Sequence, residues 1–207
     1  MKLRPHISRR RVLILAAVPV VAVTAFLTGP AAAHAKPAIT PSNIGFVNYD
    51  SPLSTSGPNT LMCLGTKGGE SNSPAVLWAC HENPTHPDQL WQSDGDCIND
   101  QYTFCEIQNN SHQCLGVAGA GYTAKTNVVG WNCKGSPDQF WAYVASATGC
   151  GGNYFALLNY NAYINHGETN VVGVSGGETN ITNGAQLILF NDQRTCNNQM
   201  WVGTYFS

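Results

Sequence analysis

Short hydrophobic stretches separated by turns containing Gly, Asn, Ser and Pro run through the chain after residue 43. They are rich in β-branched, aliphatic or aromatic residues, a composition typical of β-strands. Examples are residues 75–78, 127–131 and 186–190. No segment in this part keeps apolar residues at i, i+3, i+4 and i+7 over twelve positions, so long amphipathic helices are not expected. The pattern predicts one all-β domain of about 160 residues.

One motif occurs three times in the same order. Each copy starts with a strand ending in hydrophobe-x-Asn, continues with a glycine and then an aromatic residue, and closes with Gln-x-Trp. The glycine precedes the glutamine by 24, 23 and 26 positions, from Gly65 to Gln89, Gly116 to Gln139 and Gly173 to Gln199. An internal period decides the architecture. It predicts one closed three-fold unit with repeats at about 44–95, 96–145 and 146–207.

Residues 1–35 have the features of a signal peptide. A basic start precedes a mostly apolar run at 12–27, and Ala33-His34-Ala35 has the small-x-small form of a cleavage site. The 16-residue run is short for a bilayer span of about 20 residues, so export is favoured over a retained anchor. Residues 8–13 resemble a twin-arginine signal, an alternative to the general secretory route. We expect a secreted protein, with residues 36–43 as a tail or linker.

Removal of this segment changes the charge balance. Residues 36–207 hold five Lys or Arg against twelve Asp or Glu, a formal net charge of −7. Nucleic-acid-binding domains usually carry a basic footprint, so a nucleic-acid partner is not expected. An anionic membrane surface is disfavoured for the same reason, and no membrane span is expected after signal cleavage.

All eight cysteines lie in the exported part, which predicts a disulfide framework. Two pairs occupy the same places in the first and second copies, and a third flanks a short polar turn that we expect to form a hairpin. The predicted bridges are Cys63 with Cys80, Cys114 with Cys133, Cys97 with Cys105, and Cys150 with Cys196. The third copy has Val171 and Asp192 at the paired positions. No Cys-x-x-Cys pair is present, so a zinc site is not expected.

These residues resemble the ricin B-type β-trefoil lectin family. The likeness rests on three Gln-x-Trp motifs in register, two with paired cysteines, and covers about residues 44–207. The resemblance implies a β-trefoil of three pseudo-symmetric four-stranded repeats, stapled here by disulfides. It also implies non-catalytic binding of a glycan or polysaccharide in shallow pockets, with no cofactor and no metal.

The resemblance divides the motif residues into two groups. The Gln-x-Trp residues are interpreted as structural, because a buried indole N–H needs a partner and a Gln amide can bond to backbone groups. These are Gln89, Trp91, Gln139, Trp141, Gln199 and Trp201. The carbohydrate-binding residues would be a stacking aromatic and the polar residue before each glutamine: Trp78 with Asp88, Trp131 with Asp138, and Phe190 with Asn198. Core packing beside the disulfides is the equal alternative for the aromatic residues.

Galactose-binding members of the family carry an aspartate where this chain has Gly65, Gly116 and Gly173. The simplest interpretation is a turn with positive φ. Without that aspartate, a sugar needs another hydrogen-bond acceptor. We hypothesise that the carboxylates of Asp88 and Asp138 accept hydrogen bonds from the sugar hydroxyls instead. Residues on the following loops, Glu70, Tyr122 or Glu178, would lie nearby.

Two functions from different classes remain. The first is a secreted, lectin-like carbohydrate-binding protein. The alternative is a secreted β-trefoil that binds a protein, as a protease inhibitor or a toxin-like accessory subunit, with degenerate sugar sites. An enzyme is not expected, since no Gly-x-Ser-x-Gly or phosphate-binding loop is present. His81 and His86 are interpreted as surface histidines rather than a metal-binding pair.

Overall fold

The computed structural model describes residues 44–51, 60–81, 86–145, 150, 153–193 and 195–205, without the side chains of Asp94 and Asp96. The predicted signal peptide at 1–35 and tail at 36–43 lie outside the described residues. Contacts divide the chain into Met1–Ala38 and Ile39–Ser207, and everything described below lies in the second unit.

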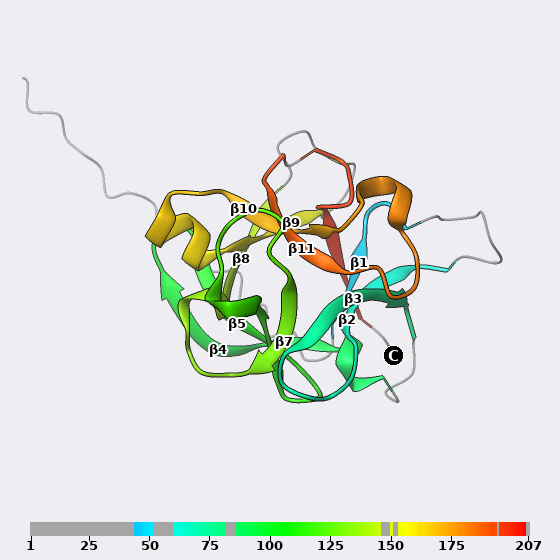
Figure 1. Ribbon diagram of the computed structural model, residues 1–207, viewed down its shortest axis with the longest axis horizontal. Coiled ribbons are helices and arrows are strands. Elements are labelled where there is room, and N and C mark those ends of the chain that lie inside the picture. Colours follow the sequence, from blue (N-terminus) through cyan, green and yellow to red (C-terminus); the bar gives the residue numbers. More distant parts are fainter. Residues whose placement is uncertain are drawn as a thin grey trace, which may run out of the picture. The chain divides into compact units, whose positions relative to one another are not determined.

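The described residues form twelve β-strands and five short helical turns, as the hydrophobic pattern predicts for an all-β domain (Figure 1). The strands are β1 (Ile44–Asn48), β2 (Met62–Thr66), β3 (Ser73–Ala79), β4 (Trp91–Asn99), β5 (Thr103–Asn109), β6 (Gln113–Val117), β7 (Val128–Asn132), β8 (Phe140–Ala145), β9 (Phe155–Asn159), β10 (Asn170–Val174), β11 (Leu187–Asn191) and β12 (Trp201–Tyr205). The helical turns are η1 (Pro87–Gln89), η2 (Ala118–Ala120), η3 (Pro137–Gln139), η4 (Asn161–Asn165) and η5 (Gly177–Asn180).

The strand pairings close a ring. β1 pairs with β4, β4 with β5, β5 with β8, β8 with β9, β9 with β12, and β12 with β1, all antiparallel. Figure 1 shows β1, in light blue, beside the red C-terminal strand, and full-length register joins Ile44–Asn48 to Tyr205–Trp201. The remaining strands form three hairpins, β2–β3, β6–β7 and β10–β11. Closure leaves the ring strands without a free edge for another chain to pair with.

The core is built around the three tryptophans of the Gln-x-Trp motifs. Trp91, Trp141 and Trp201 are all 0% exposed and belong to one hydrophobic cluster. Each indole N–H donates to a backbone carbonyl on the first strand of a hairpin. The acceptors are Leu64 at 3.0 Å, Leu115 at 2.8 Å and Val172 at 3.2 Å, respectively. These bonds tie each hairpin to the ring.

The four predicted disulfides form. They join Cys63 to Cys80, Cys97 to Cys105, Cys114 to Cys133 and Cys150 to Cys196. The second bridge lies inside the β4–β5 hairpin, where its two cysteines face each other in register, as expected from the polar turn between them. No cysteine among the described residues is free.

One helical element was not predicted. The π-helical turn η4 lies on a second apolar cluster that includes Phe104 and Phe140. The backbone N–H of Ala162 donates to the side chain of buried Asn159, which starts the turn. Five residues are too few for a hydrophobic period to reveal them. No helix of the described segments is long and apolar enough to cross a membrane.

The Asp50 carboxyl has a raised pKa. Burial raises the pKa of its carboxyl to about 6, and the negative charge of Glu178 raises it further. Its Oδ2 atom is buried and has no hydrogen-bond partner among the residues that the structure describes. Because the folded-state pKa lies above the unfolded value of 3.8, the fold favours the protonated form. Ionisation of Asp50 therefore lowers the free energy of unfolding as pH rises from about 4 to about 6. Above about pH 6 its contribution no longer changes with pH.

We expect Asp50→Asn to raise the free energy of unfolding at pH 7 by about 1 kcal/mol, a value reduced for partial solvent exposure. The gain should disappear below about pH 4, where the wild-type carboxyl is protonated in both states. Thermal unfolding of the two proteins between pH 4 and pH 7 measures it. Equal stabilisation at both ends of that range would contradict the assignment.

Candidate functional site

The glutamine of each Gln-x-Trp motif bonds to the backbone at the end of a hairpin's second strand and just beyond it. Its Nε2 donates to the carbonyls of Ala79, Asn132 and Asn191 at 3.1, 2.9 and 3.2 Å in the three copies. Its Oε1 accepts from the backbone N–H of His81, Lys134 and Gln193 at 3.1, 2.9 and 3.0 Å. Three identical bond pairs fix the backbone just beyond the three predicted stacking residues.

Those stacking residues lie at the domain surface. Trp78, Trp131 and Phe190 are each partly exposed, and none belongs to the two buried clusters. In the hairpin register, Trp78 faces Cys63 and Trp131 faces Cys114. Each of the three side chains therefore has part of its surface accessible to a ligand.

The polar residues before each glutamine differ in what they already bind. Oδ2 of Asp138 accepts from the Val117 N–H at 3.2 Å, and Asp138 is 7% exposed. Oδ1 of Asn198 accepts from the Val174 N–H at 3.3 Å, and Asn198 is 8% exposed. Asp88 is more exposed and its carboxylate makes no hydrogen bond within the described part of the chain. Asp88 therefore has the carboxylate that is most available to a ligand.

The three glycines that replace the family aspartate lie in extended strands and have no positive φ, so the prediction of a left-handed turn is wrong. Their surroundings are closely packed. A Cβ at Gly65 would lie 3.0 Å from Trp78 and 3.1 Å from Oδ2 of Asp88. A Cβ at Gly173 would lie 2.8 Å from Phe190 and 3.1 Å from Asn198. At Gly65 and Gly173 the aromatic and polar residues thus crowd the space that an aspartate side chain would need.

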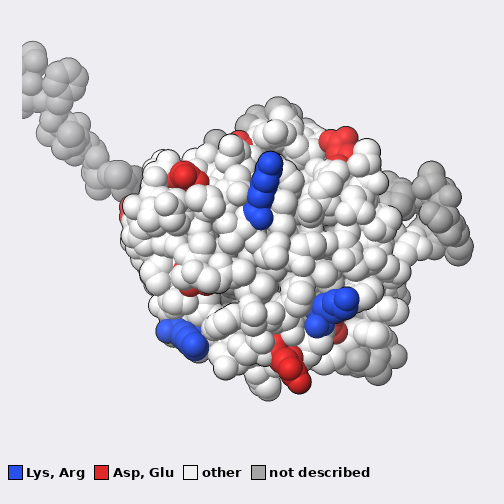
Figure 2. Space-filling view, in the orientation of Figure 1, with Lys and Arg blue, Asp and Glu red and all other residues white. Residues whose placement is uncertain are grey.

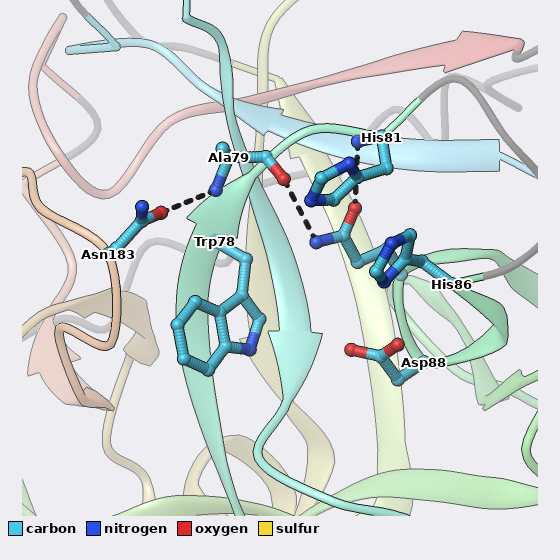
Figure 3. A pocket seen from close by; sticks show the side chains of 7 residues that line it. Trp78, Ala79, His81, His86, Asp88 and Asn183 are labelled. Atoms are coloured by element: carbon cyan, nitrogen blue, oxygen red, sulfur yellow. Dashed lines mark hydrogen bonds between the residues drawn. The ribbon is translucent and has the colours of Figure 1, made fainter.

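Trp78 and Asp88 line the same hollow, of about 310 Å³. Figure 3 shows the Asp88 carboxylate facing the edge of the indole ring, with His81 and His86 above it. Asn183, from the loop between β10 and β11, forms part of the other wall and accepts a 2.7 Å hydrogen bond from the Ala79 N–H. An aromatic face beside a carboxylate and an amide suits a ligand with one apolar face and several hydroxyls.

The two histidines were not predicted to belong to this site. Their rings stack at 3.9 Å between centroids, which brings both into the lining of the Trp78 hollow. His81 is positioned by the Gln89 bond and His86 directly precedes η1. Among the described residues there is no group of three or more His, Cys, Asp or Glu arranged to hold a metal ion.

A second hollow, of about 440 Å³, surrounds Phe190. Its lining is Lys125, Asn127, Ser175, Gly176, Gly177, Ile188 and Phe190. Asn198 lies behind this surface, 3.6 Å from the position of a Cβ on Gly177. Three loop residues were expected near the Asp88 and Asp138 carboxylates. None of them, Glu70, Tyr122 or Glu178, lines either hollow. Tyr122 instead stacks on His166, with centroids 3.4 Å apart.

Trp131 lies beside a lysine rather than beside histidines. The Lys134 ammonium lies 5.6 Å from the centroid of its ring, within the range of a cation–π interaction.

Figure 2 shows basic and acidic side chains dispersed over the viewed face, without a patch of one sign. This face therefore does not have the basic footprint of a nucleic-acid-binding surface.

The closed ring with its three hairpins is a β-trefoil-like, all-β fold, and comparison with known proteins extends this description. Residues 54–150 match the family described as the ricin-type beta-trefoil lectin domain. The resemblance is therefore confirmed over these residues, which contain the first two Gln-x-Trp motifs. No curated protein matches the sequence.

Solved structures similar to this chain include lectins. A designed three-fold symmetric protein, ThreeFoil, has a TM-score of 0.58 at 16% identity, covering 78% of this chain and 96% of its own. The β-trefoil lectin of the Vibrio vulnificus hemolysin/cytolysin, with N-acetyl-D-lactosamine bound, has a TM-score of 0.52 at 14% identity, covering 80% and 96%. The Polyporus squamosus lectin has a TM-score of 0.53 at 14% identity. That match covers 79% of this chain and 49% of the lectin. At these identities the likeness concerns the fold.

Proposed function

We propose that the protein is a secreted, non-catalytic carbohydrate-binding protein that recognises glycans through shallow pockets with an aromatic platform. The observation that carries the proposal is the Trp78 hollow, where a partly exposed indole ring lies beside the Asp88 carboxylate, which makes no hydrogen bond with the described residues. A pyranose has an apolar C–H face that can stack on the ring and hydroxyls that can donate to the carboxylate. The similar lectin from Vibrio vulnificus was solved with N-acetyl-D-lactosamine bound, which supports a sugar ligand.

We further propose that the fold is a β-trefoil of three pseudo-symmetric four-stranded repeats. The support is the recurrence of the same contacts at three places. In each, an indole N–H donates to a hairpin strand, and a glutamine side chain donates to the backbone through its Nε2 and accepts from the backbone through its Oε1. The packing around Gly65, Gly116 and Gly173 adds a third recurring contact. Under this proposal the three sites are related in position but differ in chemistry.

A glycan array with the purified, oxidised protein tests the function. We expect binding that Trp78→Ala weakens by about tenfold or more, as is usual for a central aromatic anchor. Tyr205→Ala is the matched control, because Tyr205 is an aromatic residue that is 71% exposed and lines neither hollow. Equal loss in both variants, or no loss in Trp78→Ala, would reject the Trp78 hollow as the site.

Binding of a protein partner, with degenerate sugar sites, is the second candidate. One observation favours it: Asp138 and Asn198 are buried, and one side-chain oxygen of each already accepts a backbone N–H, so these two residues are less available to a ligand than Asp88 is. A folded protein that binds no glycan on the array, but inhibits a protease or associates with a toxin subunit, would establish this candidate instead.

A further inference from the structure

Three loop residues share an unusual backbone conformation. Asn72, Lys125 and Gly184 have φ angles of +70°, +73° and +81°. Each N–H donates to the carbonyl of the residue just before a stacking aromatic. The acceptors are Gly130 at 2.8 Å, Leu189 at 2.7 Å and Leu77 at 2.7 Å, respectively. Each loop therefore forms a wall beside an aromatic residue that belongs to a different part of the chain.

Lysine is the exception among the three. Glycine has no Cβ, and asparagine tolerates the left-handed region because its short side chain bonds locally. Lysine has neither advantage, so its conformation carries a cost. The Lys125 side chain is exposed and makes no ion pair or hydrogen bond with the described residues, so the fold does not explain its presence. A strained residue without a structural role is a signal of function when it lies in a pocket.

Lys125 lies in the Phe190 hollow and is the one charged residue of that lining. The position of Asp88 is taken here by Asn198, which is uncharged and bonded to Val174. The Trp78 hollow has the opposite character, with the Asp88 carboxylate and no lysine or arginine in its lining. The two hollows thus present the same kind of aromatic platform with opposite charge.

We propose that the Phe190 hollow binds an acidic sugar, a hexuronic acid whose ring stacks on Phe190 and whose carboxylate pairs with the Lys125 ammonium. The inference rests on the proposed carbohydrate-binding function and specifies its ligand class. The Trp78 hollow selects neutral sugars, because the Asp88 carboxylate repels the carboxylate of an acidic sugar. The net negative charge of the exported chain does not prevent this pairing, since charges beyond about 8 Å are screened at physiological ionic strength.

The test compares matched acidic and neutral sugars. Galacturonate and galactose, and glucuronate and glucose, are titrated into the oxidised protein and followed by NMR. We expect the acidic sugar to bind about tenfold more tightly at the Phe190 hollow than its neutral partner, since a charge-assisted bond adds to the stacking. High salt should reduce that preference. Sodium acetate, which has the carboxylate without the ring, should not bind measurably.

Lys125→Gly separates binding from folding. Glycine relieves the backbone strain, so we expect the melting temperature to stay equal or rise while the preference for the acidic sugar is lost. Phe190→Ala should remove uronate binding from this hollow. Lys67→Gln is the matched control, because it removes one exposed lysine charge outside both hollows and should leave the preference unchanged.

The outcomes distinguish this inference from the proposed function. Neutral sugars that bind at Trp78, with no preference for uronates at Phe190, would overturn the inference and leave the proposed function standing. A preference that survives Lys125→Gly would also overturn it. If the folded wild-type protein binds none of these sugars but binds a glycan on the array, the inference alone is overturned, and failure in both experiments would overturn both.

Discussion

Replacing Trp141 by alanine is expected to lower the free energy of unfolding by about 4 kcal/mol, within the range for large-to-small changes of a buried aromatic residue. Trp141 is 0% exposed in the central cluster, and its indole N–H is the partner of the Leu115 carbonyl. The substitution leaves a cavity and a buried carbonyl without that bond. Domains of this size are stable by about 5–15 kcal/mol, so a large share of the stability would be lost.

Guanidinium denaturation followed by circular dichroism measures this loss. Trp131→Ala is the matched control, because Trp131 lies ten positions earlier in the sequence but is partly exposed. We expect the control to cost about 1 kcal/mol or less, as for most changes away from the core. If the two variants unfold at the same denaturant concentration, Trp141 is not the anchor that its burial indicates.

The second large effect concerns the bridge between Cys150 and Cys196. Its sequence separation of 46 is the longest of the four. In the chain-entropy model, closing a loop of that length contributes about 4 kcal/mol, against about 2.5 kcal/mol for a separation of 8. We therefore expect the double replacement of Cys150 and Cys196 by serine to destabilise the protein more than the same change at Cys97 and Cys105.

Backbone pairing reinforces this difference. Cys97 and Cys105 lie opposite each other in β4 and β5, so the hairpin ladder keeps them close without the bridge. Denaturant titrations of the two double variants give the comparison. A larger loss for the short bridge would show that native-state packing, rather than loop closure, determines what these bridges contribute.

The repeated motif allowed much of the fold to be predicted from the sequence. The period placed Trp91, Trp141 and Trp201 at equivalent positions, and a buried indole has few alternatives to a core position. The disulfide pairs at Cys63 and Cys114 followed from the same register. Strand pairing is strongly specified by hydrophobic alternation and by turns, both of which can be read locally.

The sites were harder to predict, because their walls come from distant parts of the chain. Asn183 reaches the Trp78 hollow from more than one hundred positions away, and Lys125 reaches Phe190 from a different hairpin. The function of Gly65 was also misjudged, because a glycine that makes room for a neighbouring ring has the same sequence signature as one in a turn. The sequence held one signal of the difference between the sites. Lys125 stands six positions before the aromatic residue of its copy, where the other two copies have Asn72 and Gly184.

The walls of the aromatic sites are exchanged in a cycle. The loop after β2 lies against the strand of Trp131, the loop after β6 against that of Phe190, and the loop after β10 against that of Trp78. No hairpin therefore completes its own binding surface. Under the proposed three-fold arrangement, an isolated copy of this unit would lack the wall beside its own aromatic residue. Because each wall and the aromatic residue beside it lie in different hairpins, a substitution in one loop can change the chemistry of a site without changing its own aromatic residue.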